Sequence, residues 1–172
     1  MTADPIRLLE DARAARRSPF ERMIRRHHAR LRRFASALLV DRARVDDVLQ
    51  EAYLKTYRKS PSFANDAHEL AYLHRVVYRC CLDELRRVKR SREMPVAEVI
   101  ELGATMSDPL ARTLADEAWR QLSDNDRAVL LLVDVAGFDY AAAARILRVP
   151  RGTVASRLSF ARERLRGRMS DA

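Results

Sequence analysis

Glycine is scarce in this chain: only four of its 172 residues are glycine, while 48% are hydrophobic. A fold built from many β-strands needs frequent tight turns, and glycine supplies the backbone conformations that many of these turns require. Hydrophobic residues instead recur every three to four positions, which places them on one face of a helix. The sequence therefore predicts an all-α protein.

The distribution of charge divides the chain into three parts. Residues 1–90 carry 21 basic and 12 acidic side chains, residues 91–110 carry one and four, and residues 111–172 carry eleven and eight. The middle part also contains Pro95 and Pro109 and has no long helical repeat. We therefore expect two small basic helical domains, 1–90 and 111–172, joined by an acidic linker over 91–110.

The first unit is predicted to be a three-helix bundle. Ser18 and Glu21 have the spacing of a capping box, with proline at the first helical position between them. A second apolar stripe predicts a helix over 42–59. Asp66 and Glu69 repeat the capping-box spacing before a third helix, whose end carries the basic string Arg86, Arg87, Lys89 and Arg90. Each helix has a single apolar face to bury, which favours a bundle with one arginine-rich end.

The second unit is predicted to contain four helices and a helix-turn-helix. The expected helices are 110–122, then 129–135 after a Ser123 and Asp126 cap and before a break at Gly137, then 140–147 and 151–168. The last two are joined by a brief turn at Pro150, and the second bears arginines, which is typical of DNA-binding modules. On that final helix the expected buried stripe is Val154, Leu158, Ala161 and Leu165.

Three ordered segments resemble one known family. The string GFDYAAAARILRVPRGTVASRLSFARERLR is similar to the region 4 helix-turn-helix of extracytoplasmic-function (ECF) sigma factors, in the sigma-70 superfamily. DDVLQEAYLKTYR resembles region 2 of that family, and AYLHRVVYRCCLDELRR resembles the helix that follows it. The resemblance runs from Phe20 to Arg90 and from Ala111 to Arg168. It implies a protein that binds core RNA polymerase, recognises a two-part promoter and helps to open the duplex.

One face of the second helix is predicted to bind polymerase. Its positions i, i+3, i+4 and i+7, opposite the apolar stripe, are Asp47, Gln50, Glu51 and Leu54. The resemblance assigns the first three of these positions to contacts with the clamp helices of the largest polymerase subunit. Carboxylates on an otherwise basic protein suit a basic partner surface. Periodicity by itself also allows an ordinary solvated acidic face.

The third helix is predicted to hold the minus-ten element. Single strands are bound by stacking on aromatic rings beside a basic groove. The resemblance implies that this helix, and the loop over 60–67 before it, receive the element with one base flipped out. Tyr72 stands where the family usually has tryptophan, and Arg79 replaces a frequent asparagine and can contact phosphate instead of a base. Packing of Tyr72 between helices is the alternative. The predicted residues are Tyr72, His74, Arg75, Tyr78, Arg79, Arg86 and Arg87.

The final helix is predicted to read the minus-thirty-five element in the major groove. Family members often have basic residues at the positions of Ala155 and Phe160, so this helix has fewer long cationic donors. Phe160 can touch a thymine methyl group, or it can pack against the linker or a partner. The residues predicted to contact DNA are Arg151, Thr153, Ser156, Arg157, Ser159, Phe160 and Arg162.

Two other functional classes compete with this interpretation. A stand-alone helix-turn-helix regulator with a helical dimerisation or ligand-binding domain explains the second unit, but it has no need of the DDVLQE string. A protein-interaction adaptor has no need of the arginine-rich helix ends. We therefore favour a sigma factor that binds bacterial core RNA polymerase and promoter DNA. The resemblance also implies an anti-sigma partner and an acidic linker that threads the RNA exit path of polymerase.

Catalysis, cofactors and metals are not expected. The sequence contains no glycine-rich phosphate loop and no motif that combines a nucleophile, a base and an orienting group. Cys80 and Cys81 match no common zinc module, and we expect them to be packing residues with one of the pair facing away from the core. The longest apolar run, 128–133, is too short to span a bilayer. With no signal peptide evident, the expected location is the cytoplasm without membrane insertion.

Overall fold

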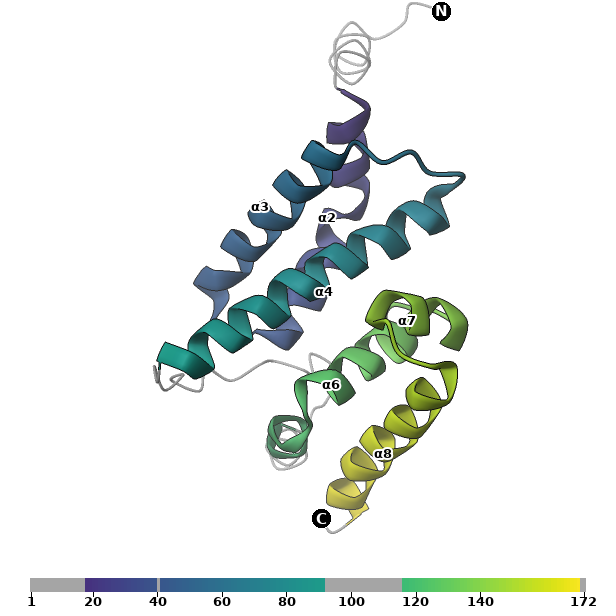
Figure 1. Cartoon of the computed structure of the whole chain (residues 1–172). Helices are drawn as coiled ribbons and strands as arrows, with labels where there is room; N and C mark the ends of the chain where they lie inside the picture. The colour runs from purple at the N-terminus through teal and green to yellow at the C-terminus, as the bar shows by residue number, and fades with distance from the viewer. Residues whose placement is uncertain (1–17, 40, 92–115, 171–172) are drawn as a thin grey trace, which may run out of the picture.

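The computed structural model describes residues 18–39, 41–91 and 116–170, and every regular element in these ranges is helical (Figure 1). The elements are α2 (Pro19–Leu38), α3 (Arg42–Lys59), α4 (Asp66–Ser91), a helical stretch over 116–121, α6 (Asp124–Leu130), the π-helical segment η1 (Leu131–Val135), α7 (Tyr140–Leu147) and α8 (Arg151–Ser170). The all-α prediction is confirmed. Most of the predicted linker, and the start of the helix expected from Leu110, lie outside the described residues.

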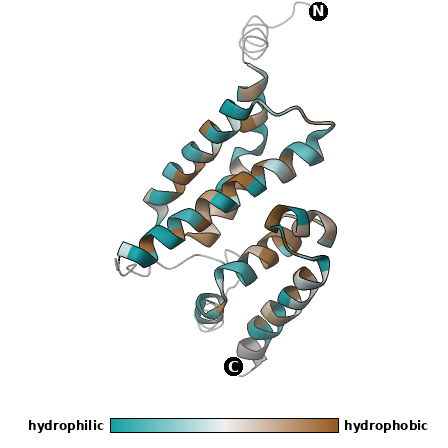
Figure 2. Ribbon diagram, viewed as in Figure 1, coloured by the Kyte–Doolittle hydropathy of each residue, from teal (hydrophilic) through white to brown (hydrophobic). Residues whose placement is uncertain are grey.

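The first lobe, residues 18–91, is a bundle of α2, α3 and α4. The side chain of Ser18 caps α2 by accepting a hydrogen bond from the backbone N–H of Glu21 at 3.2 Å. Asp41 caps α3 in the same manner through the N–H of Ala43, at 2.9 Å. Figure 2 shows the brown apolar faces of these helices turned toward one another, with teal polar residues outside. The packing of these apolar faces against one another forms the core that the helical periodicity predicted.

The start of α4 corrects one sequence expectation. Asn65, not Asp66, supplies the cap: its side-chain oxygen accepts from the N–H of His68 at 2.9 Å. The two carboxylates of the predicted capping box instead hold α4 against α2. Asp66 pairs with Arg26, and Glu69 lies 2.7 Å from Nε2 of the buried His27. Carboxylates in the first turn also suit the positive end of the helix dipole.

Both cysteines of α4 are buried, which corrects the expectation that one faces away. Cys80 is 1% exposed and Cys81 is fully buried. Helix α4 packs against α2 and α3 and also against α7 of the second lobe, and Nζ of Lys55 of α3 lies 3.6 Å from the sulfur of Cys80. A helix enclosed from two directions has a wider buried arc than a helix at the surface of a bundle.

The second lobe, residues 116–170, contains the predicted helix-turn-helix. Ser123 caps α6 by accepting from the N–H of Asp126 at 3.2 Å. The predicted helix over 129–135 is present but changes from α to π geometry at Leu131, and α8 runs to Ser170 instead of ending at Arg168. Asp139 caps α7, whose bounds match the prediction. The turn that follows is made by Arg148, whose backbone adopts the left-handed conformation at φ 57°.

The two lobes pack together along a seam formed by α4 and the second lobe (Figure 1). The Tyr78 hydroxyl donates to the side-chain oxygen of Asn125 at 2.8 Å. The His74 ring meets Phe138 edge to face, with centroids 5.0 Å apart. At the edge of the seam, Nζ of Lys89 and Oδ2 of Asp124 form an exposed ion pair at 3.0 Å. The seam therefore combines two buried aromatic side chains of α4 with polar contacts at its edge.

Glu84 joins α3 to α4 through charge-assisted hydrogen bonds. Two nitrogens of Arg87 donate to its carboxylate at 2.8 and 2.9 Å, and Arg44 of α3 donates a further short bond. The bonds from Arg87, and then those from Arg44, lower the pKa of Glu84 to about 2 from its ordinary 4.5, against the opposing effect of partial burial. A carboxyl group whose pKa is lowered by folding stabilises the folded state only while it is ionised.

We predict that Glu84→Gln removes a pH-dependent part of the stability. The contribution is fully present above about pH 4.5, where the unfolded carboxyl is also ionised, and it is lost as the pH falls toward 2. Urea unfolding of both proteins between pH 6 and pH 3 should therefore show the stability gap narrowing at the acid end. The control is Glu117→Gln, which changes an exposed carboxylate. A gap that is independent of pH would contradict the role given to these hydrogen bonds.

Candidate nucleic-acid and polymerase interfaces

The outer face of α3 presents all four residues predicted to bind polymerase. Asp47, Gln50, Glu51 and Leu54 are exposed, and the stripe on the opposite face, including Val45 and Val48, is buried. Asp47 has no ion-pair partner among the described residues, whereas Glu51 pairs with Lys55 at 2.7 Å. The face therefore combines an unpaired carboxylate with an apolar side chain that is 48% exposed at Leu54.

Aromatic residues that the sequence analysis missed extend this face into a groove of about 350 Å³. Tyr57 is 62% exposed, and its ring meets Phe20 of α2 edge to face at 5.2 Å. The Tyr53 hydroxyl lies 2.9 Å from Nδ1 of His28. The groove also includes Gln50 and Leu54. Exposed large apolar side chains that line a concave surface are typical of a protein-binding site.

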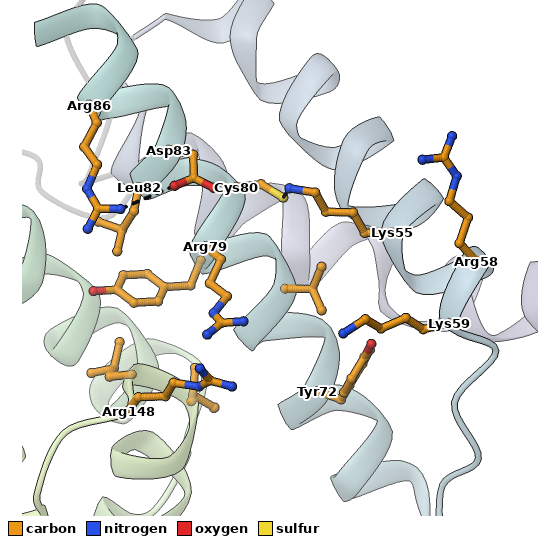
Figure 3. Close-up of a pocket in the computed structure, with 14 residues that line it drawn as sticks. Lys55, Arg58, Lys59, Tyr72, Arg79, Cys80, Leu82, Asp83, Arg86 and Arg148 are labelled. Carbon is orange, nitrogen blue, oxygen red and sulfur yellow. Dashed lines mark hydrogen bonds and ion pairs between the residues drawn. The ribbon is translucent and has the colours of Figure 1, made fainter. Parts of the chain in front are cut away.

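The residues predicted to bind the minus-ten element divide into two groups on α4. Tyr72, Tyr78, Arg79 and Arg86 line a cavity of about 710 Å³ between α3, α4 and α7 (Figure 3). Arg75 and Arg87 lie outside this cavity, and Arg87 is held by Glu84. Tyr72 is half-buried with its ring 5.3 Å from that of Phe63, so it packs and lines the cavity at once.

His74 is not placed to stack on a base, which corrects the sequence expectation. Its side chain is fully buried between Phe34 of α2, at 5.2 Å, and Phe138 of the second lobe. Nδ1 donates to the backbone oxygen of Leu70 at 2.9 Å. Burial lowers the pKa of His74 to about 4, so the ring is neutral at physiological pH. His74 is a core residue of the seam.

Tyr78 is also buried, at the seam with the second lobe. It is 5% exposed, and its hydroxyl is held by Asn125. Burial raises the pKa of Tyr78 above its ordinary value of 10. In this arrangement the ring cannot receive an unpaired base.

The cavity contains more cations than the sequence analysis identified. Three come from the end of α3 and one from the turn of the helix-turn-helix: Lys55, Arg58, Lys59 and Arg148. Together with Arg79 and Arg86 they surround Asp83, the one carboxylate among the described residues that line the cavity. The fold brings them together from positions far apart in the sequence, which no local motif signals. A cationic groove beside tyrosine rings suits phosphate and base together.

Helix α8 presents the predicted major-groove residues to solvent. Arg151, Ser156, Ser159 and Phe160 are exposed, while Thr153, Arg157 and Arg162 are half-buried. The expected stripe on the opposite face is buried, apart from a half-buried Leu165. Phe160 is 46% exposed, with the Arg164 guanidinium 5.3 Å from its ring centre. Phe160 therefore does not pack in the core.

Arg162 differs from Arg151 and Arg157, the other predicted DNA-binding cations of α8, because it pairs with a carboxylate. It makes a two-pronged contact with Asp134 of the π-helical segment, at 3.0 and 2.5 Å. Hydrogen bonding to Asp134 also raises the pKa of Arg162. This contact joins α8 to η1. It also makes Arg162 a weaker candidate for DNA contact than Arg151.

Comparison with known proteins agrees with this geometry. Residues 23–91 match the family model for Sigma-70 region 2, and residues 112–165 match that for Sigma-70, region 4. The ECF RNA polymerase sigma factor SigM of Mycobacterium tuberculosis H37Rv is 36% identical over 152 residues, covering 88% of this chain and 78% of that protein. This chain belongs to the ECF family of RNA polymerase sigma factors. It thus directs promoter-specific initiation of transcription.

Other relatives of this ECF sigma factor support the assignment. The ECF RNA polymerase sigma-E factor of Escherichia coli K12 is 30% identical over 136 residues, which cover 69% of this chain and 70% of that protein. The solved structure of the sigma factor RpoE with the anti-sigma factor NepR from Bartonella quintana has a TM-score of 0.66 and 26% identity. That match covers 88% of this chain and 96% of the other. Among the described helices of this sigma factor, none has the length and hydropathy to cross a membrane.

The exposure of Phe160 generates a prediction for this sigma factor. Phe160→Arg should change the free energy of unfolding by no more than about 0.5 kcal/mol, because the side chain is at the surface. If α8 lies in the major groove, the added guanidinium should strengthen promoter binding and steepen its salt dependence by about one counterion. Melting temperature, and affinity of the polymerase-bound protein for promoter DNA at two salt concentrations, test both points. Marked destabilisation with unchanged DNA affinity would refute the groove-facing placement.

Proposed function

We propose that this sigma factor uses α3 to bind core RNA polymerase, α4 to hold the minus-ten element and α8 to read the minus-thirty-five element. The observation that carries the proposal is the exposed groove on α3, where Leu54 and Tyr57 remain uncovered beside Gln50, with Asp47 exposed on the same helix. A helix-turn-helix regulator acting by itself has no need of such a surface. The corresponding functional division is 1–90 for region 2, 91–110 for the linker and 111–172 for region 4.

Polymerase binding combines two interactions on the α3 face. Leu54 and Tyr57 offer apolar area that is lost from water when a partner covers it. Asp47 and Gln50, on the same exposed face, offer polar groups at its edge. An apolar centre with a polar rim is the usual anatomy of a specific interface. The clamp helices of the largest polymerase subunit are the surface that the family resemblance points to.

Binding of the minus-ten strand requires the lobes to part. Tyr78 is buried at the seam, where its hydroxyl donates to Asn125 of the second lobe. Arg148 of that lobe lines the same cavity as Arg79. Arg79 is exposed and has no ion-pair partner among the described residues, so it can bind phosphate, but a base cannot stack on Tyr78 while that ring is 5% exposed. We infer that the closed arrangement belongs to the free protein and that polymerase binding spreads the two lobes along the promoter.

Recognition of the minus-thirty-five element rests on few long side chains. Arg151 and Arg157 are the predicted cations of α8 without an ion-pair partner among the described residues, since Arg162 is held by Asp134. Ser156 and Ser159 are short and exposed, and either can contact a base edge. We expect selection at this element to be loose and to depend mainly on phosphate contacts.

The proposal also covers the setting in which the protein works. It acts in the cytoplasm, where polymerase and promoter DNA are found, as a non-catalytic specificity subunit that needs no cofactor. The Bartonella neighbour is described as a complex with an anti-sigma factor. By analogy, an anti-sigma partner would bind this protein and keep it from polymerase.

Run-off transcription with bacterial core polymerase on fragments of the source genome tests the whole proposal. We expect transcripts only when both core polymerase and this protein are present, and weak promoter binding by the free protein. Tight sequence-specific binding by the free protein, with repression and no dependence on core polymerase, would favour the stand-alone regulator.

A double substitution tests the polymerase face. Asp47→Ala with Leu54→Ala should weaken binding to core polymerase by about 1–3 kcal/mol for each side chain that anchors the interface. The melting temperature should barely change, because both side chains are exposed. Titration of labelled protein with core polymerase measures the affinity. The matched control is Glu117→Ala, an exposed carboxylate of the second lobe. Unaltered affinity of the double variant for core polymerase would refute the proposal that this face of α3 binds it.

A further inference from the structure

The cavity between the lobes is strongly cationic and only partly neutralised. Lys55 pairs with Glu51 at 2.7 Å, and Arg86 pairs with Asp83 at 3.4 Å. The other four lining cations have no ion-pair partner among the described residues: Arg58, Lys59, Arg79 and Arg148. Four uncompensated charges around one cavity repel one another and favour an anion at its centre.

Two of these cations approach from opposite lobes. Figure 3 shows the Arg79 side chain of α4 and the Arg148 side chain, from the turn after α7, pointing toward one another across the cavity. Within the described residues, no carboxylate lies within ion-pair distance of either guanidinium. Guanidinium groups bind phosphate oxygens through paired, charge-assisted hydrogen bonds. Their convergence forms a cradle for a phosphate group.

The remaining wall of the cavity is suited to a larger ligand. Tyr72 lies beside Lys59 in Figure 3, and Val76, Ile146 and Leu147 contribute apolar surface. The volume of about 710 Å³ is within the range of small-molecule sites. A row of phosphates can therefore lie among the cations while an attached ring system meets Tyr72 and the apolar residues.

We propose that the closed protein binds a small polyphosphate anion in this cavity, either a nucleoside polyphosphate or inorganic polyphosphate. Arg148 belongs to the site only while the lobes are together, so the ligand binds the closed arrangement more tightly than the open one. By linkage, it shifts the population toward the closed arrangement. Given the proposed function, which assigns Arg79 to the minus-ten element, the ligand also competes with promoter DNA.

Isothermal titration calorimetry of the full chain, without polymerase and without added Mg²⁺, tests the site. The probes are GTP and inorganic tripolyphosphate, at about 0.1 M salt so that distant charges are screened. We expect saturable one-to-one binding that Arg148→Asn weakens by about tenfold or more, as expected for the loss of a charge-assisted bond. Asparagine tolerates the left-handed backbone at this position, so the turn is kept. The matched control, Arg145→Gln, removes an exposed α7 charge that does not line the cavity and should leave the affinity unchanged.

The two probes distinguish the sources of the ligand. Tighter binding of GTP assigns a nucleoside polyphosphate with its base near Tyr72, and equal binding assigns the phosphates alone; either result supports the site. The proposal is overturned if neither probe saturates, if both variants weaken binding equally, or if the protein binds a single-stranded oligonucleotide but neither probe. These outcomes do not depend on run-off transcription, so failure of the polyphosphate site and failure of the proposed function can be told apart.

Discussion

Burial of α4 on two sides is the constraint on which the rest of the described structure depends. One side completes the bundle with α2 and α3, and another receives α7 of the second lobe. The exposed pair between Lys89 and Asp124 adds little to this seam, because surface ion pairs contribute about 0–1 kcal/mol. Burial of the Tyr78 ring is the larger effect, since full burial of a large apolar side chain contributes about 1.5–3 kcal/mol. A seam held by so few side chains can open when a partner offers comparable contacts.

Local signals predicted the elements well, and long-range packing explains where they failed. Serine caps at Ser18 and Ser123 and the bounds of α7 follow from residues within one helical turn, so the sequence reveals them directly. The change to π geometry at Leu131 has no such local signature. Burial of both adjacent cysteines depends on tertiary packing around α4, such as Lys55 of α3 lying 3.6 Å from the sulfur of Cys80, which helical periodicity within a single segment does not show.

In the candidate sites, too, local sequence patterns predicted some features, and others depend on long-range packing. The exposed face of α3 was predictable because spacing alone separates Asp47 and Leu54 from the buried stripe. The positions of the aromatic residues of α4 were not predictable, because a ring that can stack on a DNA base can equally well pack between two protein lobes. His74 is an example, since it packs between Phe34 and Phe138. Arg148 joins the cavity only through the tertiary fold, so no motif in the sequence places it beside Arg79.

At two helix ends beside the cavity, the backbone adopts a conformation that is energetically unfavourable for residues other than glycine. Among the described residues other than glycine, only Ser60, directly after α3, and Arg148, directly after α7, have positive φ, at 41° and 57°. This conformation costs an L-residue about 1–2 kcal/mol, which glycine would avoid. At position 148 the residue is arginine and not glycine, so the backbone strain remains and a cation is kept at this turn. Selection for stability alone would favour glycine there, so a stabilising Arg148→Gly substitution should remove a charge that the second lobe presents to the first.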